Sequence, residues 1–160
     1  MKVQELMTHH VETCRPEDML ARAAQIMWDH DCGFVPVVDE NACLVGVLTD
    51  RDISMAAYTQ GLSLADIQVA SAMAAEVWTC RPEDTLVTAE RIMRDHQVRR
   101  LPVIEGAGQV VGVLSLNDLA REAQHERTSK AKELTTDEVT LTLASVCQPR
   151  LPSLLATNVH

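Results

Sequence analysis

Aromatic residues are scarce in this chain. Its 160 residues include one Phe, one Tyr and two Trp. The hydrophobic core must therefore be filled by aliphatic side chains and methionine. Apolar residues make up 46% of the chain and charged residues 23%, which is the usage of a globular protein and argues against disorder. The length suits one compact domain, or a pair of repeats with a short appendage.

Long apolar runs are missing as well. No stretch reaches about 18 apolar residues, the length that a transmembrane helix needs. Near the start of the chain, Glu5 stands where a secretory signal would carry its apolar core. We therefore expect a soluble, cytoplasmic protein with no membrane partner.

Several functional classes lack their signatures. The cysteines are five in number and show no Cys-x-x-Cys spacing, which argues against a disulfide framework and a zinc site. A formal net charge of −9 argues against a nucleic-acid partner, because phosphate backbones require a basic face. No nucleophile stands at motif spacing from a base and an orienting group. We predict no catalytic residue, no metal and no catalytic cofactor.

The chain does contain an internal repeat. A shift of 66 positions aligns residues 3–53 with residues 69–119 without a gap, and roughly two positions in five are identical. Cys14 and Cys80 fall at equivalent positions, as expected for small buried hydrophobic residues. A duplicated unit therefore organises most of the sequence.

Each copy of the repeat ends in the same short motif. A Gly-Val-Leu segment is followed by Thr49 and Asp52 in the first copy and by Ser115 and Asp118 in the second. Where a strand passes into a helix, these two side chains point the same way across one turn. Such a pair suits the hydroxyls of a ribose, and the free N–H groups beside it favour a phosphate. The same residue types are also typical of an N-cap followed by an acid in the first turn.

Local patterns within the first copy predict the order β-α-β-β-α. Residues 2–7 form a helical lead, residues 11–14 a short strand, and Pro16 takes the first helical position. Residues 34–38 and 43–48 form a hairpin, and a helix through residues 53–58 closes the unit. The apolar face of the first helix comprises Leu20, Ala23, Ala24, Met27 and Trp28.

One such unit cannot bury both faces of its sheet, so we expect the two copies to pack together. The predicted fold is α/β of the α+β kind, with two β-α-β-β-α repeats about a pseudo-two-fold axis and a C-terminal helical tail. The predicted boundaries are 1–62 for repeat one, 63–125 for the linker and repeat two, and 126–160 for the extension. The axis creates a cleft lined by both repeats.

The extension departs from the repeat. Residues 124–132 are polar and basic and predict a helix continuation or a linker. A further helix starts at Thr136 and stops before Pro149, and the last residues, 150–160, are expected to be loose. The apolar positions of this helix suggest docking on the two repeats, on a dimer mate or on a client protein.

The repeated order of elements resembles the cystathionine-β-synthase (CBS) domain, and the tandem resembles a CBS pair, or Bateman module. The resemblance covers residue 3 to about residue 122. It implies a non-catalytic regulatory module that binds AMP, ADP or ATP, and sometimes NAD or S-adenosylmethionine, between the repeats. It also implies a homodimer formed through the helices. We further expect a client protein, which the sequence does not identify.

The resemblance also implies roles for individual residues. Asp52 and Asp118 would hold ribose hydroxyls, and Thr49 and Ser115 would bond to ribose or phosphate. The expected phosphate ligands are Arg99 and Arg100, with Arg51 and Asn117 beside the two motifs. The residues expected around the adenine are Thr8, His9, Val11, Gly33, Phe34, Val35, Ala75, Val77 and Leu101.

The two copies are not equivalent. Where repeat two has Arg99 and Arg100, repeat one has Gly33 and Phe34, so one prospective phosphate site is basic and its counterpart apolar. A charge-assisted phosphate contact contributes about 1.5–3 kcal/mol, so we expect one tight site and one weak or empty site. The sequence does not decide which. His30 and His96, at matching helix ends, are expected to satisfy C-terminal carbonyls.

Three other functions are compatible with the sequence. The protein could be a structural adaptor with empty clefts whose helices and tail bind a client. It could be specific for NAD or S-adenosylmethionine. A nucleotide-converting enzyme is the most remote alternative.

Overall fold

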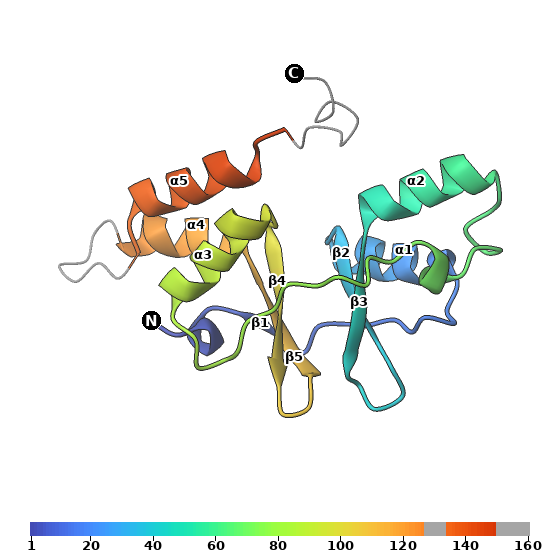
Figure 1. Ribbon diagram of the computed structural model, residues 1–160, viewed down its shortest axis with the longest axis horizontal. Coiled ribbons are helices and arrows are strands. Elements are labelled where there is room, and N and C mark those ends of the chain that lie inside the picture. The colour runs from blue at the N-terminus through green and yellow to red at the C-terminus, as the bar shows by residue number, and fades with distance from the viewer. Residues whose placement is uncertain (127–133, 150–160) are drawn as a thin grey trace, which may run out of the picture.

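The computed structural model describes residues 1–126 and 134–149. Figure 1 shows two α/β halves side by side, with the last helix packed on the second half. The predicted α+β fold of two equivalent repeats is confirmed. Repeat one contains α1 (Leu20–Asp29), β2 (Phe34–Val38), β3 (Leu44–Thr49) and α2 (Asp50–Gln60). Repeat two contains α3 (Leu86–His96), β4 (Arg100–Glu105), β5 (Gln109–Ser115) and α4 (Leu116–Glu126).

A short lead precedes each repeat and crosses to the other one. β1 pairs antiparallel with β5, with Thr8 opposite Val113, while Ala74 forms the matching bridge to Val47. Thr8 and Ala74 are 66 positions apart, and so are Val113 and Val47. The crossing of the two leads therefore follows the predicted pseudo-two-fold axis. The first lead contains the 3-10 helix η1 (Val3–Glu5) and β1 (Thr8–His9), and the second contains η2 (Val69–Ser71).

Two glycines permit this crossing. A Cβ atom at Gly112 would lie 2.7 Å from the Thr8 carbonyl oxygen, and one at Gly46 would lie 3.0 Å from the Ala74 carbonyl oxygen. A side chain at either position would push the lead away from the sheet. The glycine that opens the repeated motif is therefore explained by the exchange.

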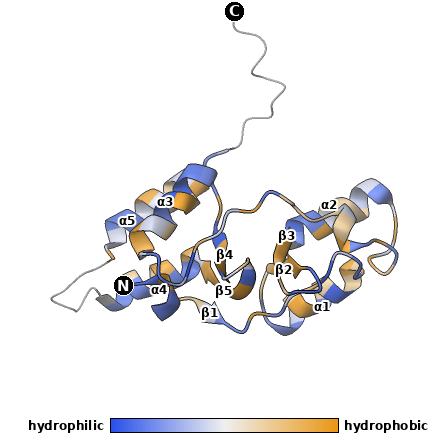
Figure 2. Cartoon of the chain, turned by 60° about the horizontal axis from the view of Figure 1, so that its bottom comes forward, coloured by the Kyte–Doolittle hydropathy of each residue, from blue (hydrophilic) through white to orange (hydrophobic). Residues whose placement is uncertain are grey.

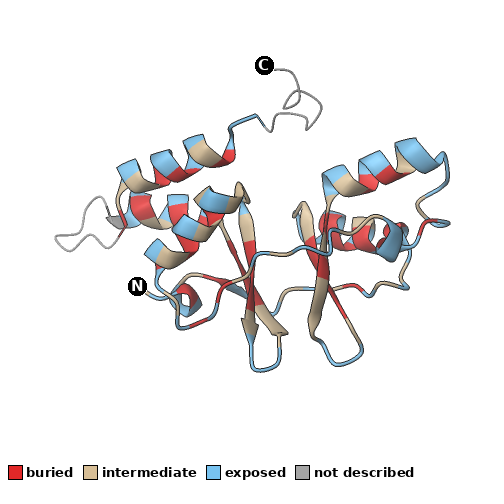
Figure 3. Cartoon of the chain, in the orientation of Figure 1, coloured by how far each residue is buried: buried red, intermediate tan, exposed pale blue. Residues whose placement is uncertain are grey.

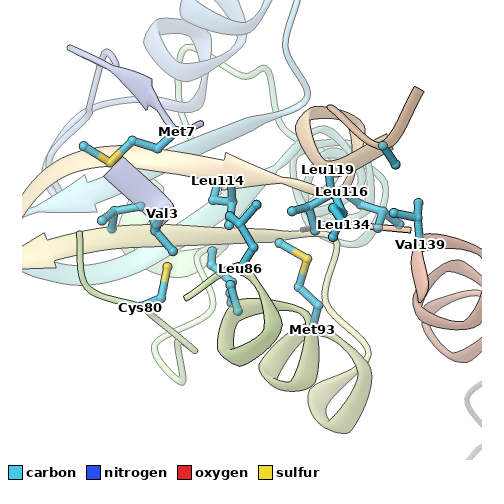
Figure 4. Close-up of a cluster of buried hydrophobic side chains, with 14 of the residues drawn as sticks. Val3, Met7, Cys80, Leu86, Met93, Leu114, Leu116, Leu119, Leu134 and Val139 are labelled. Carbon is cyan, nitrogen blue, oxygen red and sulfur yellow. The ribbon is translucent and has the colours of Figure 1, made fainter. Parts of the chain in front are cut away.

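The crossing also exchanges core residues. Val3 and Met7 lie in the core of repeat two, where Figure 4 shows them beside β5 and above Cys80 and Leu86. Val69 and Met73 take the corresponding places in repeat one, Val69 in the core and Met73 partly buried against it. Figure 3 shows buried residues along the strands and the inner sides of the helices in both halves. As predicted, the core is aliphatic, and Cys14 is buried like Cys80.

The strand predicted at residues 11–14 is wrong. Only Cys14 makes a bridge there, to Val37, and the paired strand β1 lies further upstream. Its partner β5 belongs to the other repeat, so a pattern within one repeat could not position it.

The first long helix begins later than predicted. It starts at Leu20 and not at Pro16. The Asp18 carboxylate accepts a hydrogen bond from the Arg15 N–H (2.7 Å), which closes a separate turn. The Leu20 N–H then donates to the Ile67 carbonyl (2.8 Å), so the second lead satisfies the start of α1.

Trp28 was predicted on the buried face of α1 but is 87% exposed. Eight residues beyond Leu20, its side chain lies about 80° around the helix from Leu20, on the side away from the buried residues Ala23, Ile26 and Met27. The prediction that methionines lie in the core is also wrong for Met19 and Met55, which are exposed.

The tail forms the predicted helix, α5 (Thr136–Val146), which packs on α3 and α4. Figure 2 shows hydrophilic and hydrophobic residues along both α5 and α3. Leu134, Val139 and Val146 join the core of repeat two. Of the three predicted docking partners, the repeat pair itself is the one observed. The predictions for residues 127–132 and 150–160 lie outside the described residues.

None of the helices in residues 1–126 and 134–149 combines the length and the apolar character needed to cross a membrane.

A candidate ligand cleft between the repeats

A cavity of about 400 Å³ opens where the two repeats meet, and we call it the Ser115 cleft. Repeat one, with its lead and the α1–β2 loop, provides one wall, and repeat two provides the other from β4, β5 and the first turns of α4. The lining residues predicted from the sequence are Thr8, Val11, Phe34, Arg100, Ser115, Asn117 and Asp118. The structure therefore brings together seven of the predicted residues, which come from both repeats.

Ser115 and Asp118 are held by reciprocal hydrogen bonds. The N–H (2.9 Å) and the hydroxyl (2.6 Å) of Ser115 donate to one carboxylate oxygen of Asp118, and the Asp118 N–H donates back to the Ser115 hydroxyl (3.2 Å). The other carboxylate oxygen accepts from the Arg121 guanidinium. Asp118 is only 5% exposed, so it is a buried, paired charge on the wall of the cleft.

The same capping geometry occurs in repeat one. The Thr49 N–H (2.8 Å) and hydroxyl (2.6 Å) donate to Asp52, whose N–H returns a hydrogen bond to the Thr49 hydroxyl (3.2 Å). Both motifs therefore act as helix caps, as one of the two interpretations predicted. The position equivalent to Arg121 is Met55, so Asp52 has no corresponding arginine.

Arg100 lies beside Phe34, with its guanidinium carbon 5.9 Å from the ring centroid. These two residues are repeat equivalents, 66 positions apart. Both line the Ser115 cleft, so a cation and an aromatic ring from opposite repeats meet there.

The other predicted residues do not line this cleft. Arg99 instead donates to the Cys147 sulfur (3.6 Å), and the side chains of Val35 and Leu101 are fully buried in the two cores. His9 lies 3.3 Å from the Gln4 carbonyl oxygen and lines a second cavity of about 550 Å³. The remaining predicted residues outside the Ser115 lining are Gly33, Thr49, Arg51, Asp52, Ala75 and Val77.

Sequence reasoning missed several lining residues. Arg121 could have been found, because it follows Asp118 by one helical turn. The lining residues His30, Asp31 and Cys32 belong to the loop after α1, whose place beside the other repeat carries no local signal. Glu12 also lines the cleft, and one of its carboxylate oxygens lies 4.0 Å from the Arg22 guanidinium.

The charges around the cleft nearly balance. Arg100 and Arg121 face the carboxylates of Glu12, Asp31 and Asp118. Among the described residues, no group of three or more His, Cys, Asp or Glu side chains could hold a metal ion.

The family model for the CBS domain matches two segments of the chain, residues 3–58 and 65–125. The chain belongs to the CBS domain family. Among curated relatives, the CBS domain-containing protein YhcV of Bacillus subtilis is 36% identical over 118 residues, which is 74% of this chain and 82% of YhcV. A homoserine O-acetyltransferase of Methanococcoides burtonii is 33% identical over 119 residues, or 74% of this chain. The match spans 23% of that enzyme, so CBS repeats also occur as one part of a longer protein.

Solved CBS structures share the fold of this CBS pair. The CBS domain pair of protein MJ0100, in complex with 5'-methylthioadenosine and S-adenosyl-L-methionine, has a TM-score of 0.71 at 22% identity. CBSX2 in complex with AMP has a TM-score of 0.67 at 23% identity. Each covers 79% of this chain and 98% of the other. At these identities the likeness shows the fold.

Proposed function

We propose that this CBS pair is a non-catalytic regulatory module that binds an adenosine-containing ligand in the Ser115 cleft. The observation that carries the proposal is the cavity of about 400 Å³ in which Ser115 and Asp118 meet Phe34 of the other repeat. Its volume falls in the range of small-molecule sites. The adenosine-containing ligands of MJ0100 and CBSX2 support the choice of ligand class.

Each part of the ligand has a matching partner on the cleft wall. Asp118 offers a buried carboxylate to the ribose hydroxyls, next to the Ser115 hydroxyl. Val11 and Phe34 offer apolar surface to the base. Arg100 and Arg121 are the two guanidinium groups available to a phosphate, beside the N-terminal end of α4.

We infer that the preferred ligand carries one phosphate or none. Two arginines already face three carboxylates, so each further phosphate adds negative charge without a further basic partner. AMP is therefore expected to bind more tightly than ATP. S-adenosylmethionine, with a cationic sulfonium, is the alternative that the acidic residues favour.

Signalling requires that the ligand bind two conformations with different affinity. The Ser115 cleft is lined by both repeats, so a ligand that contacts both walls favours one arrangement of the halves. α5 is a candidate reporter because the Gln97 side chain donates to the Ser145 carbonyl (3.2 Å) near the start of β4. Arg99 reaches Cys147 at the same end of that helix.

Calorimetric titration with AMP, ATP, NAD and S-adenosylmethionine tests the proposal. Asp118→Ala should weaken binding of the preferred ligand roughly 10- to 150-fold, which corresponds to about 1.5–3 kcal/mol. Asp52→Ala is the matched control, because it removes an equivalent capping carboxylate outside this cleft. Equal losses in both variants would contradict the assignment of the cleft. No heat with any of the four ligands would favour the ligand-free adaptor, and turnover of ATP would reveal an enzyme.

We further propose that the CBS pair forms a homodimer through the helices of repeat one. Trp28 on α1 and Tyr58 on α2 are 87% and 82% exposed, whereas α5 already packs on the equivalent helices of repeat two. Light scattering during gel filtration should give twice the chain mass, and Trp28→Ser with Tyr58→Ser should give a monomer. Val87→Ser removes an exposed apolar side chain from α3 and serves as control. A wild-type monomer would contradict this proposal.

A further inference from the structure

Trp78 and His96 form a stacked ring pair, with centroids 3.3 Å apart and planes 10° from parallel. Trp78 is the repeat equivalent of Glu12, and His96 is the repeat equivalent of His30, each 66 positions away. Glu12 and His30 both line the Ser115 cleft. By the repeat shift, the ring pair takes the positions that correspond to part of the Ser115 lining, on the side of the Thr49 motif, and we call this pseudo-symmetric region the second cleft. His96 thus stacks on an indole, and its predicted role as a carbonyl cap is wrong.

We propose that the Trp78–His96 pair closes this second cleft against the base, so that one chain binds one adenosine-containing ligand and not two. The inference rests on the proposed function. It adds the number of ligands bound per chain and identifies the second cleft as the one that stays closed. It also decides between the two unequal sites that the sequence predicted, in favour of the Ser115 cleft.

The stacked rings present the kind of flat contact that a purine base would seek. A ligand entering the second cleft must first separate the indole from the imidazole. The Ser115 cleft has no such pair, because position 12 carries a carboxylate that lies 4.0 Å from the Arg22 guanidinium. Base binding there displaces no stacked ring.

The second motif also lacks an arginine beside its aspartate. Met55 replaces Arg121 one turn after Asp52. The repeat shift exchanges Phe34 with Arg100 and puts Arg51 in place of Asn117, so these positions leave the second cleft with no deficit of basic residues. Ring closure by Trp78 and His96 is therefore the difference that carries the inference.

Exchanging the two equivalent residues tests the inference. Calorimetric titration of the full chain with AMP should give one site per chain for the wild type. Trp78→Glu should give two sites, because it places the residue of the open cleft in the closed one. Glu12→Trp should abolish binding in the Ser115 cleft by creating a stack with His30. Val87→Glu, which places an acid at an exposed position of α3, is the control and should keep one site.

Two AMP sites in the wild type, or one site in both wild type and Trp78→Glu, would overturn the inference while leaving the proposed function intact. Binding by Trp78→Glu alone would support ring closure and overturn the assignment of the Ser115 cleft. No AMP binding by either protein would overturn both. Trp78→Ala provides a second opening variant with the same expected gain of one site.

Tryptophan fluorescence gives an independent readout. Trp28→Phe leaves Trp78 as the single tryptophan, stacked on His96. Saturation with AMP should leave the quenching of Trp78 by acrylamide unchanged within twofold. Displacement of the ring by AMP would raise that quenching to the level of Trp28→Phe combined with His96→Ala, and would overturn the inference.

Discussion

Cys32 and Cys43 differ in what surrounds them, although both are half-buried. Cys32 lines the Ser115 cleft, while Cys43 lies before β3 in the hairpin of repeat one. Burial, with a smaller contribution from Asp18 or Asp84, raises the pKa of Cys14 and Cys80 to about 12, so these thiols remain protonated and unreactive.

A ligand in the Ser115 cleft should therefore protect one thiol selectively. At AMP concentrations about ten times Kd, alkylation of Cys32 should slow roughly tenfold, while Cys43 keeps its rate. Mass spectrometry after timed iodoacetamide labelling measures both rates in one sample. Equal protection of the two thiols would indicate a global change in place of ligand cover.

At the scale of elements, local patterns predicted what depends on neighbouring residues. The helix from Thr136 was expected from its acids, its apolar spacing and the following proline, and α5 has a capping box at Thr135 and Glu138. The repeated motif likewise caps the N-termini of α2 and α4, through Thr49 with Asp52 and through Ser115 with Asp118. Helix starts that depend on distant carbonyls, such as Leu20 on Ile67, could not be predicted, because their partners come from the second lead.

Docking of α5 should depend on one face of the helix. Val139 is 8% exposed and packs in the core of repeat two, whereas Leu141 is 62% exposed on the same helix. Val139→Ala should lower the free energy of unfolding by about 1.5–3 kcal/mol, and Leu141→Ala should change it by less than about 0.5 kcal/mol. Urea unfolding followed by circular dichroism compares the two. Equal effects would show that α5 is not docked through this face.

The contact between α3 and α5 should also depend on pH. Glu90 is 1% exposed, and burial together with the negative charge of Glu138 raises the pKa of its carboxyl group, while Arg94 and the Thr142 hydroxyl partly offset this shift. A raised folded-state pKa means that Glu90 contributes stability at low pH, and that this contribution is lost as pH rises through that pKa.

Glu90→Gln removes this titration. The variant should therefore gain stability relative to the wild type between pH 5 and pH 8, by a few degrees in Tm. Thermal unfolding at both pH values measures the difference. Glu83→Gln, which removes an exposed acid, is the control. A difference between Glu90→Gln and wild type that is the same at both pH values would contradict the assignment.

At the scale of the whole molecule, the duplication was visible in the sequence but the exchange of leads was not. β1 has only two residues, and its partner β5 lies more than 100 positions away, so no local pattern indicates the pairing. The lining of the Ser115 cleft could not be predicted for the same reason. Asp31 and Cys32 line it together with residues of repeat two that are distant in the sequence. Each half thus completes its core with a segment that the sequence assigns to the other half.

Because the two leads cross, two equivalent substitutions should destabilise opposite halves of the molecule. Val3 and Val69 are both fully buried, but Val3 packs in the core of repeat two and Val69 in that of repeat one. Val3→Ala and Val69→Ala should each lower the free energy of unfolding by about 1.5–3 kcal/mol. Hydrogen exchange should locate the loss in different halves, because local opening follows the weakened core.

For Val3→Ala, amide exchange should accelerate in α3, β4 and β5, although the substitution lies at the start of repeat one. For Val69→Ala, it should accelerate in α1, β2 and β3. Each variant is the control for the other, since both remove the same atoms from equivalent positions. The contrary result is exchange that accelerates only in the repeat that directly follows the substituted lead in the sequence. That result would mean that each lead packs on its own repeat. The Ser115 cleft would then lack the crossing lead that forms part of one wall.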